Sequence, residues 1–186
     1  MLPEMESLTT DPQDSRTHFR FVELPGEIRN QIYLYAIYPE LSTVIVCNCE
    51  KPEHFGSRIL RLPLFRISRQ IRAESLSFLC ATKTFKILGI VTANAFFQVI
   101  GTAIGKMKSM TLLQPLSEIT PSCKERTDRF FSSMTDAKAL KEFRLEGLGN
   151  WVPLCNEGEY YTFVRRVRSL GQGKDIEIHV RFGKYG

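Results

Sequence analysis

The sequence lacks the motifs that identify most enzymes. It has no Gly-x-Ser-x-Gly turn, no His-Glu-x-x-His pair and no phosphate-binding loop that ends in Gly-Lys-Ser or Gly-Lys-Thr. The three histidines, His18, His54 and His179, are far apart, and His179 stands between the apolar Ile178 and Val180 of a predicted strand. A structural role fits that position better than the role of a catalytic base. We therefore expect a protein that is not an enzyme and that uses no cofactor.

Long apolar segments are also missing. No apolar run reaches the roughly eighteen residues of a membrane span, and mean hydropathy is −0.14. The N-terminus has neither the basic nor the apolar segment of a secretory signal. The five cysteines are odd in number and irregularly spaced, which indicates reduced thiols. The expected location is the cytoplasm or the nucleus, and no membrane partner is expected.

Two cysteines, Cys47 and Cys49, lie near His54 and raise the question of a metal site. Structural zinc sites use cysteines separated by two to four residues, together with a second pair of ligands. Only one residue separates Cys47 from Cys49, and the sequence offers no second pair. We therefore expect no metal.

Basic residues are absent from the first fifteen positions, which contain Glu4, Glu6, Asp11 and Asp14. All 25 lysines and arginines lie in the remainder, so the body of the chain is more basic than the net charge of +5 suggests. A basic body favours an acidic partner surface or a nucleic acid, but no RNA-binding aromatic motif and no helix-turn-helix supports the nucleic acid. Residues 1–17 have no apolar period and are predicted to form a disordered tail.

What is present begins with a helix signal at Leu24-Pro25-Gly26-Glu27. Proline is favoured in the first helical turn, and an acidic residue suits the positive end of the helix dipole. An apolar stripe follows at four-residue spacing, with Tyr35 beside it: Leu24, Ile28, Ile32 and Ala36. Pro39 ends this helix. β-branched residues predict strands at 43–47 and 84–88, and apolar periodicity predicts one long helix over 62–80.

The second half contains a repeated apolar pattern. The pattern of Ile104, Met107, Met110 and Leu112 recurs 33 positions later in Ala137, Leu140, Phe143 and Leu145. A looser third copy lies at Leu170, Gly173, Ile176 and Ile178. Amphipathic helices precede the three copies, at 93–103, 123–134 and 159–170.

The repeated unit is therefore a helix followed by a strand, with strands near 109–113, 141–146 and 175–180. Such units return each strand parallel to the one before it. The predicted fold is α/β, with helices at the N-terminus followed by leucine-rich-repeat-like helix–strand units in a mostly parallel sheet. Met110, Phe143 and Ile176 should be buried on neighbouring strands.

Arginines gather around the predicted helix over 62–80: Arg58, Arg61, Arg66, Arg69 and Arg72. A solvated helix face is the simplest interpretation. If the two helices pack, however, Arg69 or Arg72 can meet Glu27, and Arg29 can meet Glu74. We expect Arg69 or Arg72 to be partly buried against an acid on the first helix or on its own helix, because an unpaired buried charge is costly.

Two segments carry a family resemblance. Residues 21–33, FVELPGEIRNQIY, resemble the start of an F-box, and more closely the Leu-Pro-x-Glu-Ile-Arg-x-x-Ile-Tyr block of a large group of fungal F-box-like proteins. Residues 65–75, FRISRQIRAES, resemble the second block of that group, and Thr84-Phe85 matches the strand that follows it. The resemblance covers residues 19–88.

This resemblance implies a substrate receptor of a cullin-based ubiquitin ligase. An F-box-like region over 18–90 would dock on the adaptor subunit, and the repeats over 91–186 would hold an unknown protein substrate, all packed as one continuous domain. By match, the adaptor surface would consist of Leu24, Pro25, Ile28, Ile32 and Tyr33. The sequence departs from an ordinary F-box because a strand and a loop over 43–61 separate its two blocks. Two alternatives stay open: an interaction module with no ubiquitin role, whose stripe packs on its own second helix, and a basic nucleic-acid-binding protein.

Overall fold

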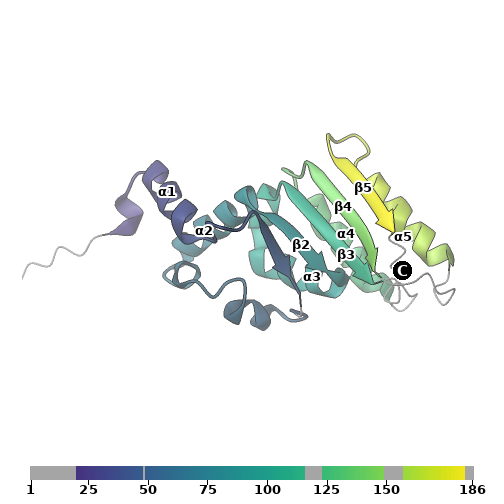
Figure 1. The fold of residues 1–186 in the computed structure, drawn as a ribbon, viewed down its shortest axis with the longest axis horizontal. Helices are drawn as coiled ribbons and strands as arrows, with labels where there is room; N and C mark the ends of the chain where they lie inside the picture. Colours follow the sequence, from purple (N-terminus) through teal and green to yellow (C-terminus); the bar gives the residue numbers. More distant parts are fainter. Residues whose placement is uncertain (1–19, 48, 116–122, 149–156, 183–186) are drawn as a thin grey trace, which may run out of the picture.

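A sheet of five parallel strands forms the centre of the structure, a computed structural model that describes residues 20–47, 49–115, 123–148 and 157–182 (Figure 1). The strands lie side by side in chain order: β1 Thr43–Val46, β2 Thr84–Leu88, β3 Ser109–Pro115, β4 Glu142–Leu148 and β5 Glu177–Phe182. The predicted α/β class and parallel sheet are confirmed. The predicted tail over 1–17 lies outside the described residues.

Helices connect these strands and precede them: α1 Gly26–Ala36, α2 Arg69–Thr82, α3 Gly89–Ile100, α4 Lys124–Thr135 and α5 Glu157–Ser169. Short 3₁₀ turns lie between them: η1 Phe21–Glu23, η2 Pro52–Ser57, η3 Pro63–Phe65 and η4 Gly101–Lys106. In Figure 1, α4 and α5 lie behind the strands. None of the helices within the described ranges is long and apolar enough to cross a bilayer.

One face of the sheet is buried against the helices. Alternate strand residues point into the core: Val44, Val46, Phe85, Ile87, Met110, Leu112, Phe143 and Leu145. Burial of each such side chain contributes about 1.5–3 kcal/mol. Strands that are covered on both faces are apolar throughout, so the alternation in β4 indicates that its second face is exposed to solvent.

The helical layer contains its own row of aromatic rings. Phe97, Phe130 and Phe163 lie 33 residues apart on α3, α4 and α5. The Phe97 and Phe130 ring centroids are 5.8 Å apart, and Phe131 connects the row to Phe163 at 5.5 Å. The repeat that the strands suggested therefore also holds in the helices.

The third strand of the repeat is shifted from its predicted register. Met110 pairs with Phe143 as expected, but Phe143 pairs with Ile178 and not with Ile176. Ile176 precedes β5 and is only partly buried. The connection from α5 to β5 is two residues longer than a strict 33-residue period allows, and this moves the strand by two positions.

The long helix predicted over 62–80 is wrong at its beginning. The chain forms η3 at Pro63–Phe65, and α2 begins only at Arg69. Ser68 caps α2, because its Oγ accepts a hydrogen bond from the Ile71 amide at 3.2 Å. A serine at this position satisfies an amide that has no partner within the helix, and so favours a helix start over a helix interior.

Candidate functional site

The inner face of α1 anchors it to α2. Tyr33 on α1 and Ile37 directly after it are 1% and 0% exposed. The Tyr33 ring lies between Phe21 and Phe78, with both centroid distances at 5.8 Å. Tyr33 was a predicted partner-binding residue, and this assignment is wrong, because a buried side chain offers no surface to a partner.

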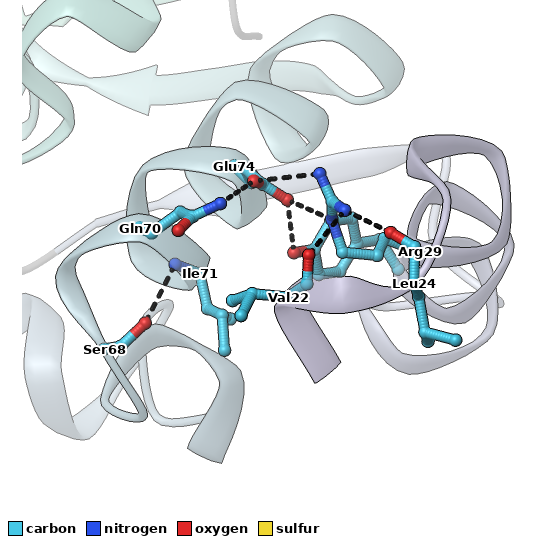
Figure 2. Close-up of polar contacts among 8 residues, drawn as sticks. Val22, Leu24, Arg29, Ser68, Gln70, Ile71 and Glu74 are labelled. Atoms are coloured by element: carbon cyan, nitrogen blue, oxygen red, sulfur yellow. Dashed lines mark hydrogen bonds and ion pairs between the residues drawn. The ribbon is translucent and has the colours of Figure 1, made fainter. Parts of the chain in front are cut away.

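A polar cluster completes this contact between α1 and α2 (Figure 2). Arg29 Nε donates to Glu74 Oε2 at 2.8 Å, and Nη2 donates to Oε1 at 3.2 Å. Glu74 also accepts hydrogen bonds from Tyr33 Oη and Gln70 Nε2, both at 3.0 Å. The third Arg29 nitrogen, Nη1, donates to the carbonyl oxygens of Val22 and Leu24. One guanidinium thus joins the segment before α1 to the middle of α2.

The cluster shifts the pKa values of Tyr33 and Glu74 in opposite directions. Burial, together with the hydrogen bond to the Glu74 carboxylate, raises the pKa of Tyr33 to about 12. Desolvation alone would raise the pKa of Glu74, but the hydrogen bonds from Arg29, Gln70 and Tyr33 outweigh it and hold the pKa below its ordinary value. Glu74 is therefore charged at neutral pH, and the ion pair is formed.

The outer face of α1 presents an apolar stripe to solvent. Ile28 is 47% exposed, Tyr35 is 74% exposed, and Ile32 between them is half-buried. Their spacing of four and three residues places them on one side of the helix, away from Tyr33. We call Ile28, Ile32 and Tyr35 the outer stripe. Of the other residues expected to bind the adaptor, Leu24 is half-buried and Pro25 is exposed.

Among the described residues, Arg69 and Arg72 do not contact the acids expected for them. Arg69 is exposed, and Arg72 is half-buried with its Nη1 on the carbonyl oxygen of Phe65 at 3.2 Å. Glu27 is exposed on α1. Within the described chain, neither arginine forms an ion pair, so the predicted contact with an acid is wrong, whereas the predicted partial burial holds for Arg72. A backbone carbonyl satisfies the half-buried Arg72 in place of a carboxylate.

The second face of the sheet forms another surface, which is exposed at Ile45 and Arg144, half-buried at Lys86 and His179, and buried at Thr111. Neighbouring strands align one row of side chains across it: Ile45, Lys86, Thr111, Arg144 and His179. Lys86 pairs with Glu146 at 3.4 Å across β3, and Arg144 Nε donates to Glu142 at 2.7 Å. Acids thus neutralise Lys86 and Arg144 on this face, which does not favour nucleic-acid binding.

Three side chains on the same face have the spacing of metal ligands: Glu142, Glu177 and His179. Protein groups already satisfy them, however. Ser109 Oγ donates to Glu142 at 2.8 Å, Arg144 donates to its other oxygen, and His179 Nε2 lies 2.9 Å from Glu177. Among the described residues, Cys47, Cys49 and His54 do not form such a group.

The comparisons with protein families, curated proteins and solved structures find no match to this chain.

Two features of the structure were not predicted, although the sequence contains signals for them. Tyr33 was predicted to belong to the adaptor surface. It follows Ile32 directly and therefore lies about 100° around the helix from the exposed stripe, on the side where it packs against Phe78 of α2. The 33-residue spacing of Phe97, Phe130 and Phe163 was visible in the sequence and would have located the helical core.

Proposed function

We propose that this protein is an F-box-like interaction module that docks on the adaptor subunit of a cullin-based ubiquitin ligase through the outer stripe of α1. The observation that carries the proposal is the exposure of Ile28 and Tyr35 on a helix whose opposite face is anchored in the core. An exposed apolar stripe on a rigid helix is a typical protein-docking surface.

The two resembling segments also contact each other. Arg29 belongs to the first block, and Glu74 and Gln70 belong to the second. The blocks therefore form one packed unit, although β1 and η2 separate them in the sequence. This packing supports the F-box-like interpretation of residues 18–90.

The repeats supply a second surface for a protein substrate. Leucine-rich-repeat-like units would build a sheet whose strands follow the chain order and whose second face is not covered by helices. Its exposed face carries charges of both signs on adjacent strands, including Arg144 and Glu177. Mixed charge favours a specific protein target over a nucleic acid.

The test is adaptor binding by purified protein, with wild type compared to a variant that carries Ile28→Asp and Tyr35→Asp. Both side chains are exposed, so the circular dichroism spectrum should not change. Leu34→Asp is the matched control, because Leu34 is 45% exposed on α1 but lies off the stripe. We expect binding by wild type and Leu34→Asp and at least about tenfold weaker binding by the double variant.

Absence of wild-type binding to the adaptor would reject the ubiquitin role and favour an interaction module of another kind. Equal binding by all three proteins would reject the outer stripe as the docking surface.

A further inference from the structure

The edge of the sheet at β1 has unpaired backbone groups. The Ser42 carbonyl accepts from the Thr84 amide at 3.0 Å, so the backbone groups of Ser42 face β2. Consecutive residues of a strand point their backbone groups to alternate sides. The amides and carbonyls of Thr43 and Ile45 therefore face away from β2, and in the part of the chain that is described they have no hydrogen-bond partner.

This edge also lacks the usual protection of an edge strand. Natural edges carry charged side chains, prolines or bulges that discourage pairing with another chain. The opposite edge, β5, has Glu177, His179 and Arg181 at alternate positions, whereas β1 reads Thr-Val-Ile-Val. Ile45 is 63% exposed, and nearby Leu41 is 46% exposed.

A groove of about 370 Å³ lies along the same strand. Thr43, Val44 and Ile45 form one wall, and the segment that contains Arg58, Ile59 and Arg61 contributes the other. Tyr38 also lines the groove and holds that segment in place, since its Oη donates to the Ile59 carbonyl at 2.5 Å. The groove is therefore shaped by fixed contacts on both sides.

The groove is flanked by positive charge. Arg58 and Arg61 are both exposed, and neither forms an ion pair with a carboxylate among the described residues. Among the described residues, the Arg58 guanidinium donates to the Cys47 carbonyl alone, at 3.5 Å. Two such arginines beside an open strand favour an acidic occupant.

We propose that β1 binds an extended acidic peptide segment of a partner protein, which adds a sixth strand to the sheet. The backbone of the partner pairs with Thr43 and Ile45, its apolar side chains contact Leu41 and Ile45, and its acidic side chains meet Arg58 and Arg61. Strand addition draws affinity from main-chain hydrogen bonds and specificity from side chains at alternate positions.

The experiment uses a labelled synthetic peptide of about six residues, the usual length of a strand, in which valine alternates with aspartate or glutamate. Fluorescence anisotropy with the full chain should show saturable binding. The same peptide with N-methyl groups on alternate amides cannot complete the ladder, and a version with lysine in place of the acids has the wrong charge. We expect both to bind at least about tenfold more weakly.

Protein variants locate the site. Ile45→Pro removes an outward amide, which an edge strand tolerates, and should weaken binding about tenfold, whereas Ile45→Thr keeps the amide and should cost less. Arg58→Glu with Arg61→Glu should weaken binding by a similar factor, and Arg69→Glu, an exposed arginine on α2, should leave it unchanged. If Ile45→Pro does not fold, the N-methylated peptide on wild type tests the same hydrogen bonds.

The proposal is overturned if the N-methylated peptide binds as well as the plain one, or if a folded Ile45→Pro variant keeps wild-type affinity. It is also overturned if the chain dimerises through β1 in sedimentation experiments and binds no peptide, because the occupant would then be a second copy. The variant with Ile28→Asp and Tyr35→Asp should bind the peptide normally, so the result does not depend on the adaptor proposal.

Discussion

Single side chains hold α1 in place, and Glu74 is the most connected of them. It accepts four hydrogen bonds from three side chains, so its removal leaves the guanidinium of Arg29 and the hydroxyl of Tyr33 without their acceptor. We expect Glu74→Ala to lower the free energy of unfolding by about 2 kcal/mol in urea titrations. Glu27→Ala removes an exposed acid of α1 and should cost no more than about 0.5 kcal/mol. Equal losses in the two variants would contradict a structural role for the cluster.

Because of the same cluster, we expect the protein to lose stability at high pH. The ordinary pKa of tyrosine is 10.0, and the pKa of Tyr33 is raised to about 12 in the folded state. A raised folded pKa stabilises the protein at all pH values below the unfolded pKa, and this contribution is lost as pH rises from about 10 to about 12. Tyr33→Phe should remove that part of the pH dependence, measured as the difference in unfolding free energy between the two proteins. A difference that stays constant between about pH 10 and pH 12 would show that the Tyr33 hydroxyl does not contribute to the pH dependence of stability.

Gly101 has a backbone conformation that favours glycine. Gly101 ends α3 with φ at 52° and ψ at −128°, a combination that side chains with a Cβ rarely adopt. Gly101→Ala should destabilise the protein by about 1–2 kcal/mol, although no atom lies near the added methyl group. Gly26→Ala is the control, because Gly26 is helical with equally open space. Thermal denaturation of both variants compares the two positions, and similar melting temperatures would argue against backbone strain at Gly101.

Between elements, the row of aromatic rings connects the helices of the helical layer. Phe130 on α4 touches Phe97, Phe131 and Phe143, and it is fully buried. Phe130→Ala should therefore cost about 3–5 kcal/mol, the usual range for an aromatic residue in a core. Ile67→Ala truncates a residue that is 59% exposed and should have little effect. A loss below about 1 kcal/mol for Phe130→Ala would mean that the helices pack mainly through other contacts.

The order of the strands in the sheet predicts which strand unfolds first. Strands in chain order contact only their neighbours, so β3 is supported on both sides and β5 on one. Met110 and Leu112 of β3 are fully buried, whereas Ile178 and Val180 of β5 are only partly buried. Native-state hydrogen exchange should therefore show the strongest protection in β3 and earlier opening of β5. Uniform protection across the two strands would indicate a single cooperative unit with no weak end.

Local patterns in the sequence were enough to locate most elements. β-branched runs identified β1 and β2, and the apolar repeat identified β3, β4 and β5 within two residues of their observed ends. The pairing of Met110 with Phe143 followed from the repeat alone. These features depend on contacts between residues that are close in sequence or on a period that the chain repeats, so composition and spacing contain them.

The orientation of α1, the partner of Arg72 and the register of β5 depended on the folded protein. Tyr33 and Ile28 belong to one helix, and contacts with Phe21, Phe78 and Glu74 hold the first inward while the second stays outside. Arg72 found a carbonyl because η3 interrupts the predicted helix. Ile178 pairs with Phe143 because the connection between α5 and β5 is two residues longer than the 33-residue period predicts. The sequence therefore determined which residues are apolar and at what spacing they recur. Packing between distant segments determined which of them remain exposed.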